Sequence, residues 1–179
     1  MKKLSLLLVI ICLLIPSVGC YAHGPWKGKV IESDTKKPIQ GAVVVAVWYS
    51  LTRLNPAGSS PDTLKVIETE TNADGEFEFS SKYFISVPMF REVSGPDFLV
   101  YKPGYNVFQI SYVSEEHPLY KKGFAIIELP RLEKREDRLK AWEWAGGFRS
   151  FTNAYAGKKT YTPKLDELLQ IEETYLYRK

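Results

Sequence analysis

The sequence predicts an all-β domain of about seven strands, followed by a C-terminal α-helical extension. Two observations lead to this expectation. From Trp26 to Leu129, short runs of β-prone residues alternate with turn residues, and no helical period is visible. From Arg131 to Lys179 the chain becomes more charged, and its apolar residues recur at helical spacing. The chain has 179 residues, which is enough for one well-buried core.

The strands are located from turn residues and from apolar alternation. In the run 42–49 both alternating sets of residues are apolar, which predicts a strand buried on both faces. Asp74-Gly75 is expected to form a tight hairpin, and the loop 51–62 is longer than a typical connection. Strands are expected at 26–31, 42–49, 64–71, 76–79, 98–101, 107–113 and 124–129.

The C-terminal extension is expected to hold two helices. The first covers 131–145 and stops at Gly146-Gly147, after which 148–161 is irregular. The second begins at Pro163 and is capped by Thr162, with Arg178 and Lys179 in its last turn. Its apolar stripe is expected to dock on the strand domain.

The N-terminus has the three parts of a secretion signal. Lys2 and Lys3 give a positive start, and the apolar run from Leu4 to Ile15 follows. That run is shorter than the ~20 residues that span a bilayer as a helix. Pro16 to Gly19 then breaks the helix and supplies small side chains. The pattern predicts an exported protein with a cleaved signal.

Two cleavage sites remain open. Ser17-Val18-Gly19-Cys20 resembles a bacterial lipobox, so that the signal is 1–19 and Cys20 carries membrane lipid. The protein is then a membrane-anchored lipoprotein of the bacterial cell envelope that faces the periplasm. The alternative is ordinary cleavage after Ala22, which makes the signal 1–22 and the protein soluble in the periplasm or secreted.

Charge and cysteine content exclude several classes of function. Without Lys2 and Lys3, 22 basic residues nearly balance 21 acidic residues, so no nucleic-acid partner is expected. Cys12 leaves with the signal, and Cys20 is either lipidated or removed. The mature chain therefore has no cysteine for a disulfide, a thiol nucleophile or a zinc–thiolate site.

Three motifs resemble one known family. Gly28 to Val44, Thr71 to Phe77 and Tyr101 to Tyr105 are similar, in order and spacing, to the hallmarks of the carboxypeptidase regulatory-like domain. The resemblance implies a transthyretin-like β-sandwich over 24–130, with 131–179 as an extension outside the family pattern. It implies a scaffold and a compartment, and no reaction. The residues that carry the motifs are Gly28, Pro38, Gly41, Asp74, Gly75, Pro103 and Gly104.

The residues do not indicate catalysis. Neither His23 nor His117 is followed by Glu at the third place, as a zinc carboxypeptidase requires, and the usual hydrolase and phosphate-binding motifs are absent. We expect no catalytic residue, no cofactor and no resident metal. One alternative is a copper enzyme in which cleavage after Ala22 frees His23 to bind copper together with His117.

The expected function is therefore that of a non-catalytic envelope module, which has either a structural role or a role in binding an unknown protein or glycan. Asn72, Asp74 and Glu76 have the oxygen donors of a calcium site, but a turn explains them more simply. The tail aromatics are expected to pack in the core, or else to form a carbohydrate-stacking or protein-binding face. They are Trp142, Trp144, Phe148, Phe151, Tyr155 and Tyr161. A further alternative is a subunit of an envelope complex that docks through the C-terminal helices.

Overall fold

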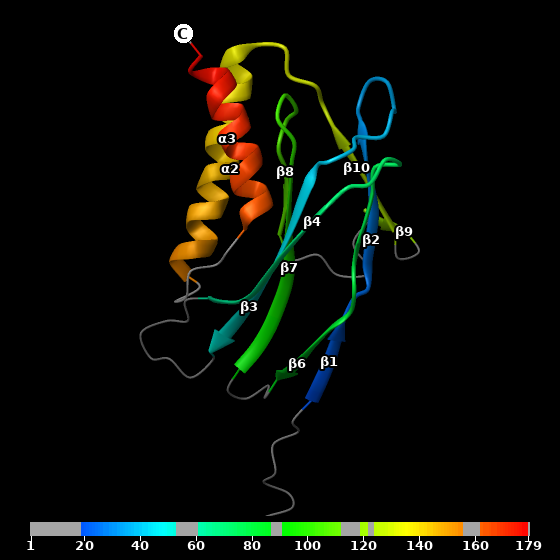
Figure 1. The fold of residues 1–179 in the computed structure, drawn as a ribbon. Coiled ribbons are helices and arrows are strands. Elements are labelled where there is room, and N and C mark those ends of the chain that lie inside the picture. The colour runs from blue at the N-terminus through cyan, green and yellow to red at the C-terminus, as the bar shows by residue number, and fades with distance from the viewer. Residues whose placement is uncertain are drawn as a thin grey trace, which may run out of the picture.

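The computed structural model consists mostly of β-strands in sheets, with two C-terminal helices (Figure 1). It describes residues 19–52, 61–86, 91–111, 119–121, 124–155 and 162–178. The strands are β1 (Gly19–His23), β2 (Trp26–Glu32), β3 (Val43–Thr52), β4 (Asp62–Glu70), β5 (Glu76–Phe79), β6 (Lys82–Ser86), β7 (Arg91–Tyr101), β8 (Phe108–Ile110), β9 (Tyr120–Lys121) and β10 (Phe124–Leu129). The helices are α2 (Arg135–Tyr155) and α3 (Pro163–Leu176).

Two four-stranded sheets face each other. The order β4-β3-β7-β8 forms the central sheet, and the order β5-β2-β10-β9 forms the outer sheet. All pairs are antiparallel except β2 with β10, which is parallel. Between the sheets lies a buried apolar cluster, to which the central sheet contributes Trp48 and Phe98 and the outer sheet Trp26, Phe77 and Leu129. A separate two-stranded ribbon pairs β1 with β6.

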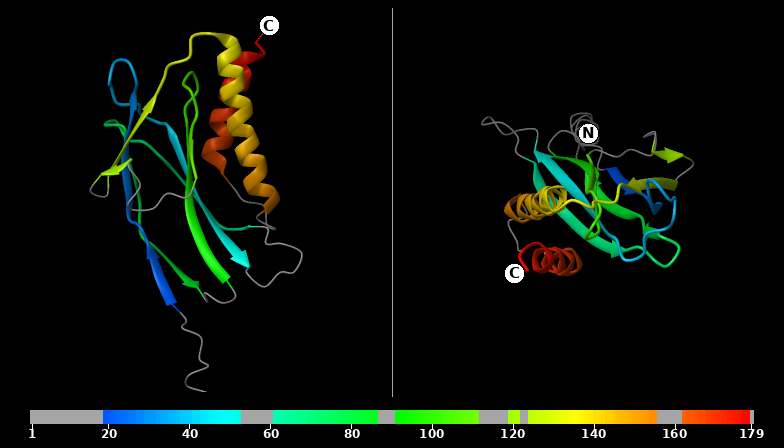
Figure 2. Two further views of the ribbon diagram at one scale, coloured as in Figure 1. Left: turned by 180° about the vertical axis from the view of Figure 1, so that it is seen from behind. Right: turned by 90° about the horizontal axis from the view of Figure 1, so that it is seen from above.

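The helices form a third layer on the other face of the central sheet (Figure 2). A second buried cluster joins Val45 and Leu99 of the sheet to Phe148 of α2 and Leu165 of α3. The expectation that 42–49 is buried on both faces is confirmed, because this strand contributes side chains to both clusters. The expected docking of the last helix on the strand domain is also observed.

The predicted strands are observed, but one predicted connection between two of them is not. Each of the seven expected strands overlaps an observed one, and β1, β6 and β9 bring the described part of the chain to ten. The prediction of a hairpin at Asp74-Gly75 is wrong, because the strands on either side of this turn do not pair with each other. Strand β4 pairs with β3, and β5 pairs with β2. The turn is closed by hydrogen bonds between Asn72 and both Gly75 and Glu76. It nevertheless carries the chain from the central sheet to the outer sheet.

The expected helix stop at Gly146-Gly147 is also wrong. Helix α2 continues through both glycines to Tyr155, so part of the stretch expected to be irregular is helical. Ala145 and Phe148 pack on the central sheet on either side of the glycines, and this burial outweighs a helix cost of about 1 kcal/mol per glycine. Helix α3 begins at Pro163 as expected, but it ends at Leu176, so its last turn does not include Arg178.

Within the described residues, neither helix is long and apolar enough to cross a membrane.

Candidate functional site

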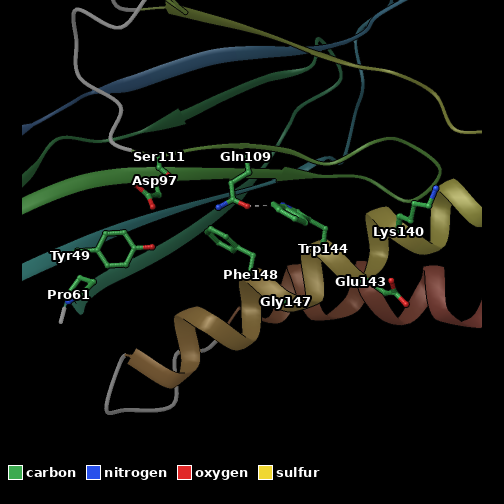
Figure 3. A pocket seen from close by; sticks show the side chains of 10 residues that line it. All are labelled: Tyr49, Pro61, Asp97, Gln109, Ser111, Lys140, Glu143, Trp144, Gly147 and Phe148. Atoms are coloured by element: carbon green, nitrogen blue, oxygen red, sulfur yellow. Dashed lines mark hydrogen bonds between the residues drawn. The ribbon is translucent and has the colours of Figure 1, made fainter.

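A cavity of about 830 Å³ lies between the central sheet and helix α2 (Figure 3). Its volume falls in the ~300–1,000 Å³ range of small-ligand sites. The sheet side is built by β3, β7 and β8 and by the residues next to β4 and β8, and the helix side by one face of α2. The lining residues are Tyr49, Pro61, Asp97, Gln109, Ser111, Lys140, Glu143, Trp144, Gly147 and Phe148.

A bulge between β3 and β7 shapes the sheet side of the cavity. Val47 of β3 lies opposite Asp97 of β7, and the next paired residue, Tyr49, lies opposite Ser94. Strand β7 therefore has one extra residue between these two pairs, and the extra residue bends the backbone next to Tyr49 and Asp97. Gly95 at the bulge has φ of +104°, and a Cβ there would lie 2.7 Å from the carbonyl oxygen of Val47. A residue with a side chain would be strained at position 95, so the bulge requires glycine there. Tyr49 and Asp97 lie at the two sides of this bulge, where the regular pairing is interrupted.

Trp144 on α2 is an exposed aromatic side chain held in one orientation. Trp144 is 59% exposed. The indole Nε1 donates a hydrogen bond of 2.8 Å to Oε1 of Gln109 on β8. Figure 3 shows this bond bridging the helix and the sheet, with Phe148 one turn further along α2. The hydrogen bond restrains the indole, whose exposed ring offers a flat apolar face to a ligand.

Gly147 has no side chain to fill the space on the helix side of the cavity. A Cβ built at this position would meet no atom within 4 Å, and the same is true of Gly146. Packing therefore requires neither glycine. Gly147 lines the cavity, whereas Gly146 lines a second hollow of about 560 Å³ between α2 and α3 that also contains the Arg149–Asp166 ion pair.

The polar groups of the cavity include acceptors, donors and hydroxyls that can act as either. Asp97 is a carboxylate with only 7% of its surface exposed, and Tyr49 is buried beside it in the lining. Ser111 adds a hydroxyl, and Lys140 and Glu143 lie on the helix side. The arrangement can take a ligand that presents an apolar face to the aromatic side chains and donates hydrogen bonds to a carboxylate.

The residues of the three sequence motifs lie elsewhere, in the scaffold. Gly28 sits opposite Phe77 in the outer sheet, where a Cβ would lie 2.6 Å from the Phe77 ring. Pro38 forms an isolated bridge with Ile31. Gly75 has φ of +75°, and a Cβ there would lie 2.5 Å from the carbonyl oxygen of Val30. Gly28 and Gly75 leave no room for a side chain, because neighbouring ring and backbone atoms approach closely.

Two side chains connect the motifs to each other. Thr71 Oγ1 donates to the carbonyl oxygen of Ile39 and accepts from the amide of Ala42. Lys102 Nζ donates to the carbonyl oxygen of Gly41, and burial lowers the pKa of this lysine, while Glu70 acts in the opposite direction. Asp74 is exposed and donates its amide to Asn72, and the Pro103-Gly104 turn joins β7 to β8. The structure thus brings the three motifs together as turns at one end of the sheets.

The residues of the N-terminal hypotheses are only partly described. Cys20 lies in β1 opposite Ile85, and His23 is the last residue of that strand. The His23 ring lies edge-on to Phe84, with centroids 5.5 Å apart. Residues 1–18 of the expected signal, His117 and most of the loop 51–62 lie outside the described residues, so the copper hypothesis stays untested. Within the described ranges, no group of three or more His, Cys, Asp or Glu side chains is placed to hold a metal ion.

Sequence reasoning found only part of the cavity. Trp144 and Phe148 were among the aromatic candidates, but Tyr49, Asp97 and Gln109 carry no motif and lie on three different strands. The one available signal was Gly95-Pro96 inside a β-prone run, which indicates a bulge.

Comparisons with known protein families, with curated proteins and with solved structures found no match to this chain.

Proposed function

We propose that this protein is a non-catalytic module of the bacterial cell envelope that binds a glycan chain in the cavity between α2 and the central sheet. The observation that carries the proposal is Trp144, an exposed indole fixed by Gln109 beside a cavity that holds the buried carboxylate of Asp97.

Sugar chemistry fits this combination of groups. A pyranose ring has a face of C–H groups that stacks on an indole, and hydroxyls at its edge that donate to carboxylate and amide oxygens. The cavity offers Trp144 and Phe148 for the first contact and Asp97 for the second. Its open helix wall at Gly147 leaves room for a chain to pass along α2.

The carboxylates of the cavity argue for binding and against hydrolysis. Hydrolysis of a glycosidic bond usually needs two carboxyl groups that flank the same bond. Asp97 and Glu143 are the two acidic residues of the lining. Figure 3 shows Glu143 on the far part of α2, pointing away from Asp97. Glu143 also lines the second hollow, which is consistent with that direction.

The architecture and the N-terminal strand support the remaining parts of the proposal. Two facing sheets, with the three motifs joined at one end, are compatible with a transthyretin-like sandwich of the carboxypeptidase regulatory-like family. Cleavage before Cys20 keeps four of the five residues of β1, from Cys20 to His23. Cleavage after Ala22 leaves only His23 opposite Lys82. The β1–β6 pairing therefore favours a lipoprotein anchored through Cys20.

Titration of the mature protein with soluble oligosaccharides tests the proposal. A panel of chito-, cello-, malto- and xylo-oligosaccharides and soluble cell-wall fragments is titrated while tryptophan fluorescence and heat are recorded. We expect at least one member to bind, with Kd below about 1 mM. Trp144→Ala and Asp97→Asn are expected to weaken that binding by at least about tenfold, which corresponds to about 1.4 kcal/mol.

A matched control distinguishes binding in the cavity from binding elsewhere on the surface. Tyr177→Ala removes another exposed aromatic side chain, one that does not line the cavity, and should leave the affinity unchanged. Binding that Trp144→Ala does not alter would place the glycan elsewhere. Absence of binding across the panel, together with co-purification of a protein that is lost in Trp144→Ala, would replace the glycan by a protein partner.

A further inference from the structure

The β1–β6 ribbon carries the two most exposed large apolar side chains of the described residues. Tyr83 is 72% exposed and Ile85 is 69% exposed, and both belong to β6. Phe84 between them is turned inward, with its ring centroid 5.9 Å from that of Trp48 and 5.5 Å from that of His23. Strand β6 therefore keeps one side chain in the molecule and presents an open apolar face on the other side.

The same ribbon adjoins the segment that directs the chain to the membrane. The apolar run of the signal ends at Ile15, and β1 begins four residues later at Gly19. Within the ribbon, Cys20 lies directly opposite Ile85, and Ala22 lies directly opposite Tyr83. The two exposed apolar residues are thus the cross-strand neighbours of the proposed lipid attachment point.

We infer that Tyr83 and Ile85 form a membrane-contacting patch that rests on the lipid surface when the protein is anchored. This inference depends on the proposed lipidation of Cys20. A lipidated Cys20 is both the first residue of the mature chain and a paired residue of β1, so no linker separates the folded domain from the bilayer. The patch contacts the headgroup layer of the same membrane into which the acyl chains of Cys20 are inserted.

The relevant lengths agree with this placement. Residues directly opposite each other in an antiparallel pair have Cα atoms about 4.5 to 5.5 Å apart. The polar layer on each side of a bilayer is roughly 5 to 8 Å thick. Ile85 therefore lies within the depth of that layer once Cys20 is at its acyl chains. Tyr83 has an apolar ring and a polar hydroxyl, a combination that is enriched at membrane interfaces.

The patch controls orientation more than attachment. Several acyl chains already hold a lipoprotein stably, so two further side chains add little to partitioning. They do prevent the domain from turning about its anchor. Figure 1 places β1 and β6 at one end of the molecule and the C-terminal end of α3 at the other. A docked ribbon would therefore hold the body of the domain, with its helices, above the membrane.

Site-specific fluorescence quenching tests the inference on the lipidated protein. Once Cys12 is removed and Cys20 is acylated, a new cysteine is the only free thiol. Tyr83→Cys and Ile85→Cys are labelled with a small fluorophore, and Ile171→Cys, at an exposed apolar position of α3, is the matched control. Each protein is reconstituted into vesicles of phosphatidylethanolamine and phosphatidylglycerol, with and without lipids that carry a nitroxide on the headgroup. Circular dichroism confirms folding, and the two reporter positions are independent of each other.

The expected result is loss of most of the fluorescence at 83 and 85 in nitroxide vesicles, with little loss at 171. Equal quenching at all three positions, or none at 83 and 85, overturns the inference. Intact mass is recorded on the same samples. A chain that begins at His23, or one without acyl groups on Cys20, overturns the anchor and the patch together, whereas glycan binding in the cavity is measured separately and can survive.

Discussion

Arg138 and Glu172 form a bidentate ion pair that joins α2 to α3. Nε of Arg138 lies 2.6 Å from Oε1 of Glu172, and Nη2 lies 2.7 Å from Oε2, while Glu172 is only 1% exposed. The hydrogen bonds that Arg138 donates to Glu172 raise the pKa of Arg138, and the guanidinium also lies 3.6 Å from the ring centroid of Tyr175. Helices α2 and α3 are thus joined by a charge pair that is largely shielded from water.

Removal of one partner should destabilise the protein strongly. Glu172→Gln leaves the Arg138 charge largely buried without a counter-charge, and we expect a loss of about 3 kcal/mol in the free energy of unfolding. The double variant Arg138→Met with Glu172→Leu should recover most of that loss, because neither charge then has to be desolvated. Urea unfolding of the three proteins measures both effects.

An exposed pair on the same helix serves as the control. Asp137→Asn breaks the pair with Lys140, whose atoms are 3.3 Å apart at the surface, and should cost less than about 1 kcal/mol. If Glu172→Gln costs no more than Asp137→Asn, the Arg138–Glu172 pair is not the buried contact between α2 and α3.

The start of α3 is capped by a carboxylate from a strand. Glu68 on β4 accepts hydrogen bonds from the amides of Lys164, at 2.8 Å, and Leu165, at 3.2 Å. These amides have no partner within the helix, and the carboxylate also complements the helix dipole. Thr162, expected from the sequence to be the cap, makes no side-chain capping bond. The cap is therefore a tertiary contact that local sequence does not reveal.

Glu68→Ala should cost about 1 to 2 kcal/mol in the free energy of unfolding, the range for the loss of a helix cap. Its neighbour Glu70 provides the matched control, since it forms a surface ion pair of 3.3 Å with Nζ of Lys164 and also lies near the charge of Lys102. Glu70→Ala should cost less than about 1 kcal/mol. Thermal and urea unfolding compare the two variants, and equal losses would show that Glu68 acts as an ordinary surface charge.

The sequence predicted local patterns well and long-range partners poorly. The burial of β3 on both faces followed from its two apolar sets, and the start of α3 followed from Pro163. Which sheet a strand joins was not readable, because Asp74-Gly75 favours a turn without specifying the partners of β4 and β5. Likewise, Gly146-Gly147 weakens a helix locally, but the packing of α2 on the central sheet overrides that preference.

The cavity was hidden for the same reason. Trp144 and Phe148 stood out as aromatic residues of the tail, but only the fold brings Asp97 and Gln109 against them from β7 and β8. The three family-like motifs, which were the clearest sequence signals, lie in the scaffold, and their residues do not line the cavity. Sites assembled from single residues on separate strands leave no spacing pattern in the sequence.

The buried hydroxyl of Tyr101 predicts a specific loss of stability at high pH. Burial raises the pKa of Tyr101 above its ordinary value, and the charge of Glu172 adds to the effect. The unfolded chain releases this proton near pH 10 while the folded protein retains it, so stability is intact below pH 10 and falls above it. Tyr101→Phe should lose about 1.4 kcal/mol less than the wild type between pH 9 and pH 11. Urea unfolding at each pH measures the difference, and parallel losses in both proteins would contradict it.

The two glycines inside α2 predict a trade between stability and binding. A Cβ at either position meets no atom within 4 Å, so Gly146→Ala and Gly147→Ala should each stabilise the protein by up to about 1 kcal/mol. Their effects on the cavity differ, because Gly147 lines it and Gly146 does not. We expect Gly147→Ala to weaken oligosaccharide binding while Gly146→Ala leaves the Kd unchanged. Urea unfolding and calorimetric titration of both variants check this, and equal affinities would mean that the open wall at Gly147 is not used by the ligand.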